Sequence, residues 1–125
     1  MRSEVRSEEK ARKIAEQNDL FRTKFYIPFF KGRPPGHMFC TGGIAALPPE
    51  TQIGIWMAVA NFRDFPADDP YGEHDFGALD MAGVGEKILW KIEYYGDQSC
   101  TSGSEDPSDP ARTFRVLTIM LVSEW

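Results

Sequence analysis

The apolar and polar positions of this chain alternate first at helical spacing and later at extended spacing. Near the amino end, one apolar stripe recurs at intervals of three, four and seven residues: Ala11, Ile14, Phe21 and Phe25, with Asn18 between them. Such a stripe is typical of an amphipathic helix, and it predicts one over residues 3–25. A proline at position 28 prevents the helix from continuing further.

A second helix is predicted after Pro48, because two successive prolines and Glu50 suit the first turn of a helix. The apolar residues that follow recur at i, i+3, i+4 and i+7: Ile53, Trp56, Met57 and Ala60. This face predicts that the second helix contributes one side to the hydrophobic core.

Four segments have extended patterns, at residues 37–41, 76–81, 87–95 and 113–122. In the third of these, Ile88, Trp90, Ile92 and Tyr94 share one face of a strand, and the other face carries Lys87, Lys91 and Glu93 with Leu89 and Tyr95. Glycines at positions 83 and 85 supply a turn before it, so residues 76–95 are predicted to form a hairpin. The last segment is apolar at nearly every position, which predicts a central strand buried on both faces.

The order of these elements is helix, strand, helix and then three strands. We therefore predict an α+β fold with two helices packed on one face of a small, mainly antiparallel sheet of three to four strands. Residues 1–13 are charged and are expected to be the frayed start of the first helix. Residues 14–125 are expected to form a single domain, a size that can bury a core without disulfides.

Charge is distributed unevenly along the 125 residues, whose net charge is −5. Residues 1–33 carry nine Lys/Arg and five Asp/Glu, whereas residues 61–110 carry three and twelve, a balance of −9. An acidic surface repels phosphate backbones, so direct nucleic-acid binding is not expected. The sequence contains neither an apolar run of membrane-spanning length nor a secretory signal pattern, so we expect a cytoplasmic protein.

The polar chemistry is concentrated in two turn-rich acidic segments, at residues 69–77 and 104–110, each of which precedes a predicted strand. Aspartate before proline caps turns with its own side chain, which is a purely structural use of several of these positions. An aromatic ring and an imidazole among carboxylates are more typical of an interface. The candidate partner-binding residues are Asp69, Tyr71, Glu73, His74, Asp75, Glu105, Asp106 and Asp109.

Four stretches also carry a resemblance to a known family. They are Gly-Ile-Ala-Ala-Leu-Pro-Pro at 43–49, Asp-Pro-Tyr-Gly-Glu-His-Asp-Phe-Gly at 69–77, Trp-Lys-Ile-Glu-Tyr-Tyr at 90–95, and Gly-Ser-Glu-Asp-Pro at 103–107 with Arg-Val-Leu-Thr-Ile-Met at 115–120. Over roughly residues 14–125 the chain resembles the small bacterial proteins grouped as domain-of-unknown-function family 3768. The resemblance implies a setting of alphaproteobacterial plasmids and other mobile elements, and no established activity.

Small proteins in such a setting often block host defence. The leading hypothesis is therefore a non-enzymatic interaction module, an anti-CRISPR or anti-restriction inhibitor that presents carboxylates to the basic surface of a nucleic-acid-handling complex. No cofactor, resident metal or membrane partner is expected.

Two alternatives remain open from the residues. A small metal-dependent or acid-base hydrolase would use Glu73, His74 and Asp106, although adjacent residues of an extended chain point to opposite faces, which separates His74 from Glu73 and Asp75. No nucleophile motif or phosphate-binding glycine loop accompanies these residues. The other alternative is a toxin–antitoxin or regulatory subunit that works through the N-terminal helix. Deletion of residues 1–13 would test it.

Overall fold

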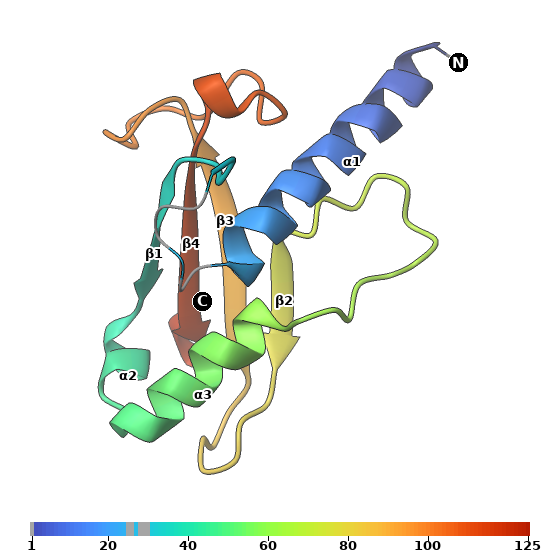
Figure 1. The fold of residues 1–125 in the computed structure, drawn as a ribbon. Coiled ribbons are helices and arrows are strands. Elements are labelled where there is room, and N and C mark those ends of the chain that lie inside the picture. The colour runs from blue at the N-terminus through green and yellow to red at the C-terminus, as the bar shows by residue number, and fades with distance from the viewer. Residues whose placement is uncertain (1, 25–26, 28–30) are drawn as a thin grey trace.

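A computed structural model describes residues 2–24, 27 and 31–125 of the chain (Figure 1). The helices are α1 (Arg2–Thr23), α2 (Gly42–Ala45) and α3 (Pro49–Ala60), and two 3-10 turns, η1 and η2, span Pro110–Arg112 and Val122–Glu124. The strands are β1 (Gly36–Cys40), β2 (Phe76–Leu79), β3 (Ile88–Tyr95) and β4 (Phe114–Leu121). The predicted α+β class is confirmed.

The four strands form one mixed sheet in the order β1-β4-β3-β2. β2 pairs antiparallel with β3, and β3 antiparallel with β4, while β1 runs parallel to β4. The predicted hairpin over residues 76–95 and the central place of the last strand are both confirmed. β1 and β2 are the two edges of the sheet.

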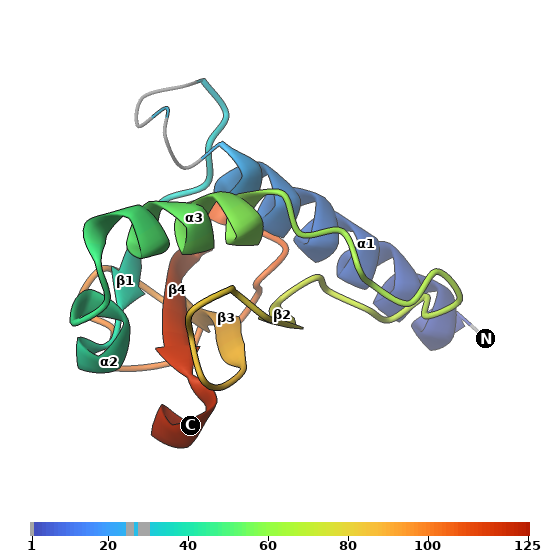
Figure 2. The same ribbon diagram turned by 90° about the horizontal axis from the view of Figure 1, so that it is seen from below.

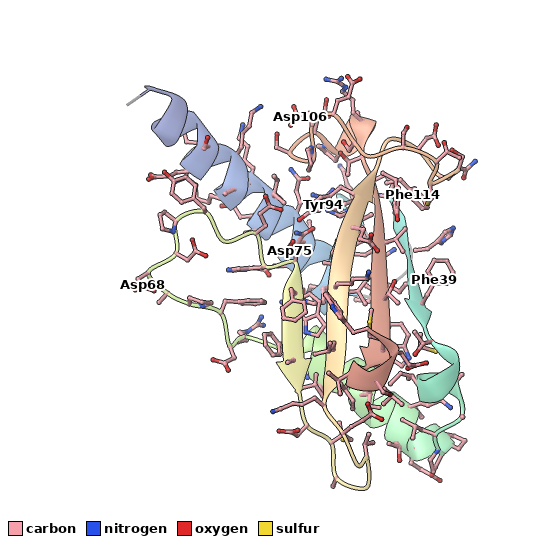
Figure 3. All side chains as sticks on the ribbon, turned by 180° about the vertical axis from the view of Figure 1, so that it is seen from behind. Phe39, Asp68, Asp75, Tyr94, Asp106 and Phe114 are labelled. Carbon is pink, nitrogen blue, oxygen red and sulfur yellow. The ribbon has the colours of Figure 1, made fainter. Side chains whose placement is uncertain are left out.

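The helices α1 and α3 form a layer over one face of the sheet, as Figure 2 shows from below. Figure 3 shows the opposite face, where the strands lie in front of the helices. The core lies between the two layers and consists of Phe21, Ile44, Ile55, Val59, Ile88, Trp90, Ile92, Leu117 and Ile119. The face of β3 that carries Ile88, Trp90 and Ile92 therefore forms one wall of this core.

The first helix buries the stripe that the sequence predicts. Ala11, Ile14, Asn18 and Phe21 are all buried, whereas Phe25 lies outside the described residues. The backbone is helical from Arg2 onward, and fraying of residues 1–13 stays a prediction. In the part of the chain that the structure describes, no helix combines the length and apolar character needed to cross a membrane.

The predicted buried face of α3 is correct for Ala60 and partly for Trp56, which packs against the core, but it is wrong for Ile53 and Met57. Ile53 and Met57 are 65% and 42% exposed, while Ile55 and Val59 are 0% and 2% exposed. The helix carries apolar side chains on all sides, so the spacing at 53, 56, 57 and 60 competes with an equally apolar spacing at 55, 59 and 60. Packing on the sheet buries Ile55 and Val59 together with Ala60, and Ile53 and Met57 face outward.

Two further details of the prediction need correction. β4 is buried along one face through Arg115, Leu117 and Ile119, whereas on the other face Met120 is buried and Phe114 and Val116 are only half-buried. The reason is that both large helices cover the same face of the sheet. The strand predicted over residues 37–41 spans Gly36–Cys40, and the two glycines that follow begin the short helix α2, which inserts Ile44 into the core.

Candidate functional site

The first acidic segment lies mainly in the loop between α3 and β2, residues 61–75, which we call the first acidic loop. This loop extends beside α1 away from the sheet (Figure 1). Asp69 begins a turn in which its Oδ1 accepts a hydrogen bond of 3.0 Å from the amide of Tyr71. Asp64, Asp68 and Asp69 are exposed, and the Tyr71 side chain is 48% exposed. Figure 3 shows Asp68 at the outer side of this loop. These residues form the outward part of the loop.

Glu73 points inward and is held by α1 and β3. Its carboxylate accepts a hydrogen bond of 2.8 Å from the hydroxyl of Tyr94, and its backbone carbonyl accepts one of 2.9 Å from Nδ2 of Asn18. Asn18 also donates to the Tyr94 oxygen at 2.8 Å. Burial raises the pKa of Tyr94, so this hydroxyl stays protonated and keeps donating to Glu73.

His74 contacts α1 through Asp19, which is not among the candidate residues predicted from the sequence. Its Nδ1 lies 3.0 Å from both carboxylate oxygens of Asp19, and its ring stacks on Phe65 with centroids 4.0 Å apart. The backbone φ of His74 is +55°, in the left-handed region that few residues other than glycine adopt. Asp19 also accepts from the buried guanidinium of Arg22 at 3.2 Å. His74 and Asp19 are therefore a pair at the junction of loop, helix and core.

Asp75 completes the anchoring of this loop. Its backbone carbonyl accepts a hydrogen bond of 2.7 Å from the amide of Ile92, which extends the pairing of β2 and β3 by one residue. The side chain is half-buried, and this burial raises the pKa of the Asp75 carboxyl. Figure 3 places Asp75 at the start of β2, close to Tyr94.

The carboxylates of the second acidic segment are used within their own loop. Glu105 forms an ion pair of 2.9 Å with Arg112. Asp109 caps the turn η1 by accepting from the amide of Ala111 at 3.0 Å. Asp106 accepts from the hydroxyl and the amide of Ser108, and these hydrogen bonds hold the pKa of the Asp106 carboxyl below its usual value. This is the turn chemistry expected of aspartate in such a sequence.

The helix α1 forms hydrogen bonds with both acidic loops. Gln17 donates a hydrogen bond of 2.7 Å to the carbonyl of Ser108 in the second loop. Its neighbour in the sequence, Asn18, donates to the carbonyl of Glu73 in the first loop. Arg115 is fully buried and connects the same elements. It donates to Asn18 at 2.7 Å, to Gln17 at 2.9 Å and to the carbonyl of Pro107 at 3.0 Å.

The structure does not connect the three residues of the predicted hydrolase site, Glu73, His74 and Asp106, through hydrogen bonds or ion pairs among the described residues. Among the described residues, no hydrogen bond or ion pair joins Asp106 to either of the other two. The same part of the chain contains no group of three or more His, Cys, Asp or Glu side chains placed to hold a metal ion. The carboxylate beside His74 is Asp19, from α1.

A sequence signal for this arrangement exists in Asn18, a polar residue in the middle of the apolar stripe of α1. A buried amide must find hydrogen-bond partners, so its place in the stripe indicates a polar contact across the core. The identity of the partners, 55 to 97 residues away, is not contained in that local pattern.

Comparison with known proteins gives one result. Residues 40–124 match the sequence model of a family described as a protein of unknown function (DUF3768). The matched region starts at the end of β1 and includes α3, all of the other strands and both acidic loops. No match is found among curated proteins or among solved structures. Because the match covers well over half of the sequence, the chain belongs to the DUF3768 family of proteins of unknown function.

Proposed function

We propose that the protein is a non-enzymatic interaction module that binds a basic protein surface through the outward part of its first acidic loop. The observation that carries this proposal is the set of exposed carboxylates at Asp64, Asp68 and Asp69, which form no ion pair with any described Lys, Arg or His. Like charges so close together repel one another. A cationic partner would relieve this repulsion.

The anchoring of the loop supports the same conclusion. Glu73 and His74 tie its end to Asn18 and Asp19 of α1, so the exposed carboxylates lie on a loop held at its base. A surface that is already ordered loses less conformational entropy when a partner binds. Tyr71, exposed beside these carboxylates, supplies the aromatic contact that protein interfaces favour.

The partner class follows from charge and from the family setting that the sequence resemblance implies. A surface that mimics spaced phosphates would compete for the basic groove of a nucleic-acid-handling complex in the cytoplasm. We therefore include anti-CRISPR or anti-restriction inhibition in the proposal. Of the eight predicted contact residues, Asp69, Tyr71 and Glu105 are exposed, but Asp69 accepts from the amide of Tyr71 and Glu105 pairs with Arg112. The neighbouring exposed carboxylates Asp64 and Asp68 are therefore the better ones to mutate.

The test is affinity purification from a bacterial host that carries restriction and CRISPR systems. The loop variant combines Asp64→Asn and Asp68→Asn, and the control combines Glu9→Gln and Glu50→Gln, which changes the net charge equally on exposed sites of α1 and α3. We expect a salt-sensitive partner whose affinity falls about tenfold in the loop variant alone, since each lost ion contact weakens binding. Equal retention in both variants would refute the proposal, and equal loss would assign binding to net charge instead.

A second candidate function is general acid-base catalysis by His74. Asp19 occupies Nδ1 of the imidazole, an arrangement that fixes the tautomer and leaves Nε2 to accept a proton, as in His–Asp pairs of hydrolases. His74 also lines cavities of about 300 and 340 Å³ beside the loop. This candidate replaces the predicted Asp106 with Asp19.

Its test is the hydrolysis of p-nitrophenyl esters and phosphodiesters by the wild type, His74→Gln and the exposed-site control His37→Gln. Loss of a general base lowers the rate by roughly 100-fold or more, so only His74→Gln should lose turnover. Turnover no faster than buffer, or an equal rate in both variants, would eliminate this candidate.

A further inference from the structure

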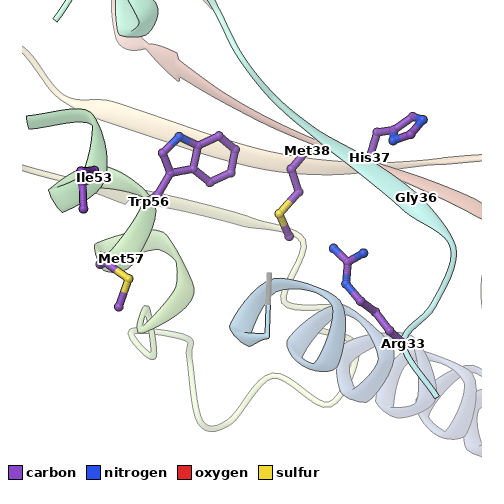
Figure 4. Close-up of a pocket in the computed structure, with 7 residues that line it drawn as sticks. All are labelled: Arg33, Gly36, His37, Met38, Ile53, Trp56 and Met57. Atoms are coloured by element: carbon purple, nitrogen blue, oxygen red, sulfur yellow. The ribbon is translucent and has the colours of Figure 1, made fainter. Parts of the chain in front are cut away.

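A cavity lies on the other side of the molecule from the acidic loop. Its volume is about 470 Å³, within the range of small-molecule sites, and it opens between β1 and α3. Figure 4 shows the described residues that line it: Arg33, Gly36, His37, Met38, Ile53, Trp56 and Met57. Neither the acidic loops nor the His74–Asp19 pair contributes to it.

The walls of this pocket are mainly apolar. Ile53 and Met57 come from the outward stripe of α3 and are 65% and 42% exposed, although side chains of this size are usually buried. Met38 is half-buried and faces them from β1. Exposed apolar side chains that gather around a cavity mark a binding site, and methionine adapts its shape to different ligands.

Arg33 brings a positive charge to the edge of these apolar walls. It is half-buried, its guanidinium lies 4.7 Å from the centroid of the Phe21 ring, and its buried Nε has no hydrogen-bond partner among the described residues. Burial lowers the pKa of Arg33, which expresses the cost of removing this charge from water. Among the described residues, no carboxylate forms an ion pair with it.

Arg22 and Arg115, which are fully buried, show how this protein accommodates a guanidinium away from water. Arg22 donates to two backbone carbonyls and to Asp19, and Arg115 donates to Asn18, Gln17 and a carbonyl. Arg33 alone of the three has no such set of acceptors among the described residues. A partly desolvated guanidinium without acceptors favours an anion that supplies them.

The single charge also limits the kind of anion. Figure 4 shows the His37 ring on the opposite side of β1 from Met38, as expected for neighbouring residues of a strand. Arg33 is thus the cation that accompanies the apolar walls. A monoanionic carboxylate fits one planar guanidinium through two parallel hydrogen bonds, whereas a dianionic phosphate would need further donors.

We propose that this pocket binds an organic carboxylate with an apolar body, with the carboxylate on Arg33 and the body against Met38, Ile53 and Met57. Two sources share this chemistry: a free apolar acid, and the carboxyl terminus of a polypeptide that ends in a large apolar residue. Binding at this site is independent of the function proposed for the acidic loop.

The experiment is a titration of the full-length chain followed by amide NMR. The probes are 4-phenylbutyrate, its neutral amide, and the peptide acetyl-Gly-Ser-Ala-Phe with a free or an amidated carboxyl terminus. We expect saturable shifts around Met38 and Met57, and about tenfold weaker binding of each neutral form, because the charge-assisted hydrogen bonds are lost. Tighter binding of the free peptide or of 4-phenylbutyrate identifies the source, and either result supports the proposal.

Arg33→Gln should weaken binding of the acids by about tenfold and leave the neutral forms unchanged. Arg12→Gln, which removes the same charge from an exposed site on α1, should bind like the wild type. If Arg33→Gln does not fold, Met57→Glu places a repelling carboxylate at an exposed lining position and should weaken the acids by a similar factor. Equal affinity for acid and amide in the wild type, or unchanged acid binding in a folded variant at position 33 or 57, would overturn the proposal.

Discussion

Nε of Arg115 donates a hydrogen bond of 2.7 Å to Oδ1 of Asn18, although the two residues are 97 positions apart in the sequence. Both side chains are fully buried, and both continue to other elements. Asn18 reaches Glu73 and Tyr94 near the first acidic loop, while Arg115 reaches the carbonyl of Pro107 in the second. One buried contact therefore connects the helix, the central strand and both acidic loops.

Replacing Asn18 with alanine should destabilise the protein by about 3 kcal/mol, because a buried charged donor and two further groups would lose their partner. The measurement is urea denaturation followed by tryptophan fluorescence. The control Lys13→Ala changes an exposed position of the same helix and should alter the free energy of unfolding by no more than about 0.5 kcal/mol. A loss of similar size in both variants would contradict the central role of Asn18.

Arg22 stabilises the end of α3 by a mechanism that depends on its shape. Its Nη1 donates to the carbonyls of Val59 at 2.5 Å and Ala60 at 3.1 Å, which are among the carbonyls that a helix end leaves without partners. The guanidinium also lies 4.9 Å from the centroid of the Trp90 ring. A planar group satisfies these contacts together, which an ammonium cannot do.

Arg22→Lys should therefore cost about 2 kcal/mol of stability despite the conserved charge. The exposed substitution Arg12→Lys provides the control and should be close to neutral. Thermal unfolding by circular dichroism measures both. A variant at position 22 as stable as the wild type would show that the two carbonyls are satisfied without the guanidinium.

The elements that the sequence predicts well are those whose patterns are local. Ile88, Trp90 and Ile92 recur at every second position, and a strand whose apolar side chains gather on one face has one favoured way to lie on a core. The same reasoning succeeds for the stripe of α1 around Ile14. It fails for α3, where Ile53 and Ile55 are equally apolar and only tertiary packing decides between them.

The candidate site shows the limit of local patterns more sharply. The acidic loops are visible in the sequence, and so is Asn18 as a polar residue in an apolar stripe. The pairing of His74 with Asp19 is not, because it depends on how a loop 55 residues later folds back onto α1. The burial of Arg115 within an otherwise apolar strand face likewise follows from acceptors supplied by other elements.

Gly36 permits a close approach between β1, α1 and β4. A Cβ at this position would overlap the backbone carbonyl oxygen of Arg115 and come within 2.7 Å of the Phe21 ring. Because a backbone atom cannot move aside cheaply, Gly36→Ala should destabilise the protein by about 3 kcal/mol. Gly85→Ala is the matched control, since its Cβ would meet no atom within 4 Å, and it should change stability by no more than about 0.5 kcal/mol. Equal denaturation midpoints for the two variants would exclude this steric account.

Glu124 gives the C-terminal turn η2 a defined dependence on pH. Its carboxylate accepts from the hydroxyl of Thr41 at 2.5 Å and from the amides of Gly43 at 3.0 Å and Leu121 at 2.9 Å, and these bonds hold its pKa below the usual value. A depressed pKa in the folded state means that this stabilisation is complete above the pKa of the unfolded chain and is lost as pH falls through the lower folded value. The amide shift of Gly43, followed by NMR, should therefore titrate at a pH below the usual range of a glutamate carboxyl. Glu124→Gln should abolish that transition and Glu50→Gln should preserve it, whereas a transition that survives in Glu124→Gln would assign it to another group.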